Sequence, residues 1–246
     1  MSSNTELESK LLKGSTIIVD NIKIRPLTLT EIIDDLGFDA YIRILSILGF
    51  DKVKFKDEIP EEEYNEIKNF DFFLAHEQLM DSFLEFLRVF LNYRDIFYIP
   101  EYQCVVFDCG NELSFMNRDN SNIIIDIFRK MYNITIEKDP EYNPANDKAR
   151  AMIEKIKKKN EAYAALHRED DTDLNSIISG VAWKSYNTNI FNVYDLTIYQ
   201  LYDAYYRLEI VDNYRNTMTG LYTGTLDGKT VNPKKISWIK RYINNN

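Results

Sequence analysis

Histidine, cysteine and glycine are scarce in this chain of 246 residues, which has two histidines, two cysteines and eight glycines. Neither His76 nor His167 has a second histidine or a cysteine at the spacing of a zinc site. Cys104 and Cys109 lack the two-residue spacer of redox and zinc motifs, and two cysteines are too few for a disulfide framework. A nucleophilic Cys–His pair stays open, but structural thiols are the better interpretation. We expect no metal and no cofactor.

Glycine scarcity also argues against nucleotide chemistry, because phosphate-binding loops need glycine where the backbone approaches the phosphate. The sequence has neither a phosphate-loop pattern nor a dinucleotide fingerprint. The acidic run at residues 170–173 superficially suggests a calcium loop, but it lacks the glycine and the closing glutamate of that motif. A solvated, helix-capping turn is the better interpretation. We therefore expect that the protein is not an enzyme.

Positive charge is in deficit, since the formal net charge is −9 and the isoelectric point is about 4.9. An acidic surface repels phosphate backbones and anionic lipids, so we expect no binding to nucleic acid or membranes. The N-terminus lacks the basic and apolar regions of a signal peptide. The most apolar stretch, residues 83–97, is interrupted by charged residues and is not expected to cross a bilayer. The expected location is a cytoplasm.

The hydrophobic pattern predicts an α+β fold that is mainly α-helical. Period-two runs bounded by turn residues predict one β-hairpin near residues 15–25 and a second near 103–116. Helical spacing is expected over most of the remainder, including a pattern from Tyr64 to Asn92. Thr28 and Glu31 have the spacing of a capping box at the start of a helix.

We predict three regions along the chain. Residues 1–136 form a helical domain with the two hairpins, 137–170 a charged linker helix, and 171–246 a C-terminal helical region. A single domain overall is the alternative. The lysine-rich part of the linker is expected to be a solvated face.

Tyrosines follow helical spacing near the C-terminus. A helix is predicted from about 195 to 218, ending at the glycines of residues 220–224, and on it Tyr199, Tyr202 and Tyr206 share one face. Leu201, Tyr205 and Leu208 form an adjacent stripe that should pack inward. The tyrosine face is a candidate protein-binding surface, because tyrosine suits interfaces that must stay soluble. A helix buried on both sides explains the two stripes equally well.

Two segments resemble a known family. The N-terminal segment at residues 22–32 (Ile-Lys-Ile-Arg-Pro-Leu-Thr-Leu-Thr-Glu-Ile), with Tyr41 soon after, is similar to tail assembly chaperones of tailed phages that infect low-GC Gram-positive bacteria. The C-terminal segment at residues 220–224 (Gly-Leu-Tyr-Thr-Gly), followed by a lysine-rich turn and Trp238, resembles the same group.

The resemblance implies a non-catalytic role in the host cytoplasm. Such chaperones bind the tape-measure protein and recruit tail-tube subunits while the tail grows. A stable structural subunit of the virion, in the tail, neck or baseplate, is the alternative. A small enzyme or a host-interaction factor is a third hypothesis.

Overall fold

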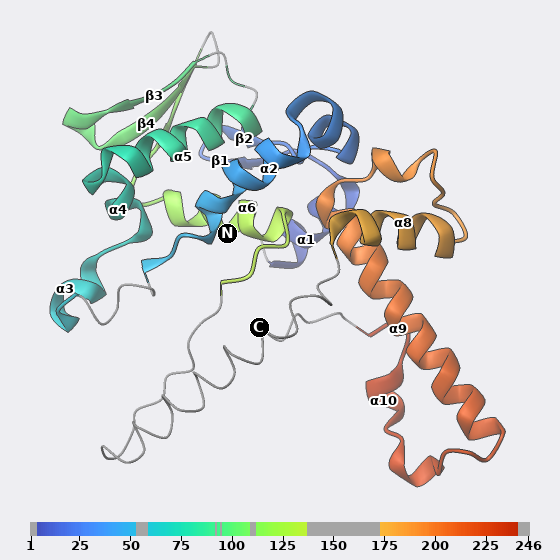
Figure 1. Cartoon of the computed structure of the whole chain (residues 1–246). Coiled ribbons are helices and arrows are strands. Elements are labelled where there is room, and N and C mark those ends of the chain that lie inside the picture. The colour runs from blue at the N-terminus through green and yellow to red at the C-terminus, as the bar shows by residue number, and fades with distance from the viewer. Residues whose placement is uncertain are drawn as a thin grey trace.

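A computed structural model describes residues 4–52, 59–91, 93, 95–108, 112–136 and 173–240. Helices dominate, and two small antiparallel sheets accompany them, so the expected mainly helical α+β class is confirmed. Figure 1 shows the sheets and most helices gathered in one body, from which the long helix α9 extends. Cys109, His167, the predicted linker and the predicted charged helix lie outside the described residues.

The first hairpin joins β1 (Ile17–Val19) to β2 (Ile22–Ile24). Asp20 and Asn21 form its turn with positive φ angles of 46° and 67°, a conformation that Asp and Asn adopt more readily than most residues. Ile17, Ile22 and Ile24 are buried against the helices. The hairpin predicted near residues 15–25 is thus confirmed.

A capping box starts the next helical segment as predicted. The Glu31 backbone N–H donates to Thr28 Oγ1 at 3.3 Å, while the Thr28 backbone N–H donates to Glu31 Oε2 at 2.8 Å. Arg25 donates to both oxygens of the same carboxylate, at 3.0 and 2.7 Å. Mainly because of the hydrogen bond from Arg25, the pKa of Glu31 is lowered from its usual value.

Glu31→Gln should lower the free energy of unfolding by about 1 kcal/mol near neutral pH, because it removes a charge-assisted contact. A carboxyl with a lowered folded pKa stabilises the fold above its unfolded pKa and loses that effect as pH falls through the folded value. The difference in melting temperature between wild type and variant should therefore shrink from roughly pH 5 downward. Glu6→Gln, which breaks the exposed Lys10–Glu6 pair, is the control. A difference for Glu31→Gln that does not change with pH would contradict the assignment.

The helical body contains several short elements. They are α1 (Asn4–Lys13), the π-helix η1 (Glu31–Leu36), α2 (Phe38–Leu45), the 3₁₀-helix η2 (Ser46–Gly49), α3 (Glu61–Glu66), α4 (Asn69–Ala75), α5 (Glu77–Phe90) and α6 (Ser121–Met131). The helical pattern predicted from Tyr64 to Asn92 corresponds to three helices, α3, α4 and α5. Lys68 and His76 break it, because both have extended backbones and each precedes a new helix.

Aromatic rings form much of the core between α4, α5 and α6. The rings of Phe73 and Phe83 stack at a centroid distance of 4.5 Å, and Phe86 lies edge-on to Phe128 at 4.8 Å. All four side chains are buried. Such pairs add to the free energy gained from burial itself, so this cluster ties the three helices together.

A buried ion pair lies at the edge of this core. Arg129 on α6 contacts Asp51 at 3.1 Å and donates to the backbone carbonyls of Leu48 at 3.0 Å and Phe50 at 2.6 Å. Arg129 also reaches Asp126, which is exposed, at 3.4 Å. The guanidinium therefore fixes the chain that follows η2 against α6.

The middle sheet has three strands where the sequence predicted a hairpin. β4 (Cys104–Asp108) pairs with β5 (Leu113–Met116) as expected, and β3 (Asp95–Ile99) adds to the other side of β4. The short 3₁₀-helix η4 (Pro100–Tyr102) joins β3 to β4. One face of the sheet packs against α5, as Figure 1 shows.

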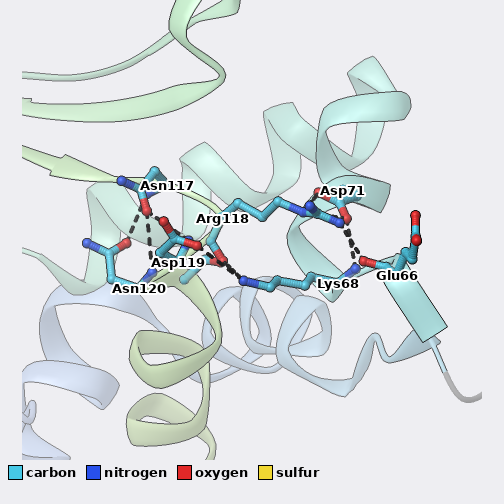
Figure 2. A network of polar contacts seen from close by, with 8 residues as sticks. Glu66, Lys68, Asp71, Asn117, Arg118, Asp119 and Asn120 are labelled. Carbon is cyan, nitrogen blue, oxygen red and sulfur yellow. Dashed lines mark hydrogen bonds and ion pairs between the residues drawn. The ribbon is translucent and has the colours of Figure 1, made fainter. Parts of the chain in front are cut away.

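A polar network fixes the turn before α6 to α4 (Figure 2). Arg118 forms an ion pair with Asp71 at 2.9 Å and donates to the backbone carbonyl of Glu66 at 2.5 Å. Lys68 Nζ, just before α4, donates to the Arg118 carbonyl at 3.0 Å and lies 3.4 Å from Asp119. The crossed contacts hold the end of the middle sheet in place relative to the helices.

The C-terminal part consists of α8 (Leu174–Lys184), η6 (Val193–Asp195), α9 (Ile198–Tyr222), η7 (Gly228–Thr230) and α10 (Pro233–Ile236). Asp173 caps α8 as predicted, accepting from the Ser176 backbone N–H at 2.7 Å. The long helix was predicted to end near 218, but it runs through Gly220 to Tyr222. Gly224, with φ of 73°, follows its end.

The N-terminal body and the C-terminal part share one hydrophobic core, to which Leu11, Ile177 and Leu201 belong. The Leu29 backbone N–H donates to the Leu196 carbonyl at 2.9 Å across the junction. The structure therefore positions α9 directly against the N-terminal body, while the three-region division stays a prediction.

Candidate protein-interaction surface

The side chains considered for chemistry are scattered. His76 is exposed between α4 and α5, and Cys104 is buried on β4, where burial raises the pKa of its thiol. Within the described ranges, no group of three or more His, Cys, Asp or Glu is placed to hold a metal ion. Among these same residues, no helix is long and apolar enough to cross a membrane.

The predicted tyrosine face lies partly against the protein's own body. Tyr199, Tyr202 and Tyr206 are all half-buried on α9. Tyr206 accepts a hydrogen bond from Asn133 at 3.4 Å, and its ring lies 6.0 Å from that of Tyr202. Burial raises the pKa of Tyr202 above its usual value. That these three tyrosines bind another protein stays a prediction.

The adjacent stripe on α9 packs inward to different degrees. Leu201 is fully buried, while Tyr205 and Leu208 are half-buried and packed on the core. The ring of Tyr205 also lies 5.3 Å from that of Tyr206, so the two stripes meet. The N-terminal half of α9 is therefore packed on more than one side.

Three other aromatic side chains of the C-terminal part are far more exposed. Trp183, at the end of α8, is 78% exposed, and Tyr186 and Phe191, in the loop that follows, are 87% and 92% exposed. We call residues 183–191 the aromatic loop. Burial of a large aromatic side chain is favourable, and this free energy is not gained while the side chain is exposed to water. Such residues are enriched at protein interfaces.

The aromatic loop starts at the C-terminal end of α8, on the exposed side of that helix. Ile177, Ile178 and Val181 of α8 are buried, so Trp183 falls on the solvent side of the helix. Ser185 follows with an extended backbone conformation, which ends the helix. The helical period itself therefore directs the indole away from the core.

Side-chain hydrogen bonds shape the rest of the aromatic loop. Ser185 Oγ accepts from the Thr188 backbone N–H at 3.2 Å, Asn189 Oδ1 accepts from that of Phe191 at 2.9 Å, and Asn192 Oδ1 accepts from that of Asn189 at 2.7 Å. Such turns fix a loop without burying its side chains. The aromatic rings are thus presented on an ordered backbone.

Contacts with α9 hold the start of the aromatic loop. Lys184 forms an ion pair with Asp212, and the Arg215 guanidinium lies 6.0 Å from the centre of the Tyr186 ring. Asp212 and Arg215 both lie in the C-terminal half of α9. An ordered, exposed aromatic surface of this kind is pre-organised for binding, because less conformational entropy is lost on association.

The chain after α9 folds back along that helix. Arg207 donates to the backbone carbonyls of Trp238 at 3.1 Å and Lys240 at 3.0 Å. Trp238 and Ile239 are 52% and 69% exposed, and Tyr222 at the end of α9 is also exposed. The C-terminal part therefore presents further apolar side chains besides the aromatic loop.

The sequence contained a signal for the aromatic loop that the tyrosine pattern obscured. Between Trp183 and Phe191 the residues are Lys, Ser, Tyr, Asn, Thr, Asn and Ile, a composition typical of turns. Aromatic residues among turn formers do not follow the period of a core helix, so an exposed position could have been considered.

Residues 157–242, about a third of the chain, match the family model described as YomV second domain. This is a Bacillus phage-type protein family, and the match suggests a phage-related protein. The matched range includes α8, the aromatic loop and α9. Searches of curated proteins and of solved structures found no match.

Proposed function

We propose that this protein is a non-catalytic tail assembly chaperone of a tailed phage, acting in the host cytoplasm. The observation that most supports this is the ordered aromatic loop, with Trp183, Tyr186 and Phe191 almost fully exposed. It lies in the part of the chain that is similar to a phage-type family. The resemblance of residues 22–32 and 220–224 to tail assembly chaperones gives the finer assignment.

The proposed partners are the tape-measure protein and the tail-tube protein of the same phage. Exposed aromatic residues would suit the transient covering of a long apolar segment of such a partner. No binding of nucleic acid or membranes is part of the proposal, since the net charge is −9.

Co-expression with each proposed partner tests this function. Full-length protein should co-purify with the tape-measure protein or the tail-tube protein and increase its soluble fraction. Co-expression with a capsid protein of the same phage is the control and should give no complex. The absence of a complex with either tail protein would overturn the proposal.

A structural subunit of the tail, neck or baseplate is the alternative. Mass spectrometry of purified virions separates the two roles. A chaperone should be missing from the finished particle, whereas a structural subunit should be present in a fixed ratio to the tail-tube protein. Stoichiometric presence would replace the chaperone assignment with the structural one.

A further inference from the structure

Positive charge gathers in one segment of this acidic protein. Residues 228–240, which run from η7 through α10, contain neither aspartate nor glutamate but four lysines, Lys229, Lys234, Lys235 and Lys240. The whole chain, in contrast, has a formal net charge of −9. We call residues 228–240 the basic tip. Figure 1 shows α10 beside α9, away from the two sheets.

The lysines of the basic tip are not neutralised within the part of the chain that the structure describes. Lys229, Lys234 and Lys235 are exposed, and their ammonium groups form no ion pair or hydrogen bond with another described residue. Lys240 Nζ donates to the Lys235 carbonyl at 2.9 Å, a neutral acceptor that leaves the positive charge in place. Several lysines elsewhere do contact a carboxylate, namely Lys10, Lys68, Lys130 and Lys184. The basic tip therefore offers its charge to a partner.

Contacts with α9 fix the backbone around the basic tip. Leu226 packs so closely on Gly220 that a β-carbon added to this glycine would lie 2.7 Å from the Leu226 side chain. The Leu226 backbone N–H donates to the Gly220 carbonyl at 3.0 Å. At the other end, Arg207 donates to the carbonyls of Trp238 and Lys240. Helix α9 thus holds the chain both just before the basic tip and at its end.

Exposed apolar side chains accompany the lysines. Trp238 and Ile239 lie between Lys235 and Lys240 in the sequence, and both are exposed. Leu226, just before the basic tip, is exposed as well. A surface that combines ammonium groups with apolar groups is complementary to a segment that carries both carboxylates and apolar side chains.

A nucleic acid fits this surface less well than an acidic protein segment does. Because the basic tip contributes only positive charge, the rest of the chain is more acidic than the net charge of −9 indicates. A nucleic acid carries its negative charge along its whole length and would be repelled by that remaining surface. A protein segment can place a few carboxylates at the basic tip and apolar side chains beside them.

We propose that the basic tip binds an acidic amphipathic segment of another protein. Carboxylates of this segment would lie beside Lys234 and Lys235, and its apolar side chains would cover Trp238 and Ile239. The charge complementarity selects such a segment over a cationic one. The basic tip shares no residue with the aromatic loop, so the inference does not depend on the proposed function.

Binding of a designed peptide to the full-length chain tests the proposal. The probe is a short fluorescein-labelled peptide of leucine and glutamate at amphipathic spacing, and a leucine–glutamine peptide of the same pattern is its uncharged counterpart. We expect the glutamate peptide to bind at least about tenfold more tightly than the glutamine peptide, with fluorescence anisotropy as the readout. Equal binding of the two peptides, or no binding of either, would overturn the proposal.

Charge variants then locate the binding. Lys234→Gln/Lys235→Gln should weaken binding of the glutamate peptide at least about tenfold. Lys13→Gln/Lys23→Gln removes the same charge from exposed positions of α1 and β2, and should change the binding less than about twofold. Equal effects of the two variants would overturn the site.

Substitution of the apolar side chains tests the other half of the proposal. Trp238→Ser/Ile239→Ser should also weaken binding of the glutamate peptide at least about tenfold, because the leucines would lose the surface that they cover. Circular dichroism checks the fold. If this variant unfolds, the lysine variant decides, because it changes only exposed side chains. A folded serine variant that binds as tightly as the wild type would overturn the amphipathic assignment.

A nucleic acid and a second copy of the chain are the competing occupants. A labelled single-stranded oligothymidylate tests the first, and analytical ultracentrifugation tests the second. We expect no binding of the oligonucleotide at a protein concentration that saturates the glutamate peptide, and an oligomeric state that Lys234→Gln/Lys235→Gln leaves unchanged. Oligonucleotide binding that these substitutions abolish, or dissociation of a wild-type oligomer by them, would overturn the proposal in favour of that occupant.

Discussion

Arg129→Met should lower the free energy of unfolding by about 3–5 kcal/mol. Methionine retains much of the side-chain length but none of the donors, so Asp51 would lose its ion pair with Arg129 and keep the hydrogen bond from Asn69. The carbonyls of Leu48 and Phe50 would lose their hydrogen bonds as well. Removing one member of a buried ion pair is costly because the low-dielectric interior replaces little of the hydration that the remaining charge has lost.

Urea denaturation of the full-length chain measures this effect. Asp126→Asn is the matched control, since it removes an exposed partner of the same guanidinium and should change the free energy of unfolding by less than about 1 kcal/mol. Similar effects of Arg129→Met and Asp126→Asn would show that the buried pair does not hold η2 to α6.

Trp183→Ala, Tyr186→Ala and Phe191→Ala should each weaken binding to the tail partner by about 2 kcal/mol or more. This corresponds to a roughly 30-fold higher Kd. The melting temperature should hardly change, because the three side chains are 78%, 87% and 92% exposed and contribute little burial to the fold.

Titration of the purified partner by isothermal calorimetry checks these values. Tyr102→Ala, which removes a 78% exposed tyrosine from η4, is the control and should leave the Kd unchanged. If the three substitutions act no more strongly than Tyr102→Ala, the aromatic loop is not the binding surface.

Tyr202→Ala and Tyr206→Ala should weaken binding if the predicted tyrosine face also contacts the partner. The structure leads us to expect an additional loss of stability, since both rings are half-buried and Tyr206 bonds Asn133. Comparing the melting temperature with the Kd separates the two effects. A lower melting temperature with an unchanged Kd would assign these tyrosines to the fold alone.

Local chemistry made part of the fold predictable. The Asp20–Asn21 turn and the Thr28–Glu31 capping box depend on residues close in sequence, and both occur as expected. Asp173 likewise caps α8 through a contact three residues away. Such features need no knowledge of distant contacts.

Features that depend on distant contacts were missed. The Ile, Phe and Tyr residues of β3 favour a strand, but only the pairing with β4 shows that they belong to the middle sheet. The exposure of the predicted tyrosine face also depends on contacts between residues far apart in sequence. Helical spacing places Tyr199, Tyr202 and Tyr206 on one face of α9, but only the fold shows that this face meets the body, where Tyr199 and Tyr202 pack on the core and Tyr206 accepts from Asn133.

Removing the gene from its phage tests the central claim, a non-catalytic role in tail assembly, most directly. Electron microscopy of the resulting lysate should show filled heads without tails. Wild-type protein and His76→Ala supplied in trans should both restore tails, whereas the triple variant Trp183→Ala/Tyr186→Ala/Phe191→Ala, folded by circular dichroism, should not. Normal tails in the absence of the protein, or failure of folded His76→Ala to restore them, would contradict the account.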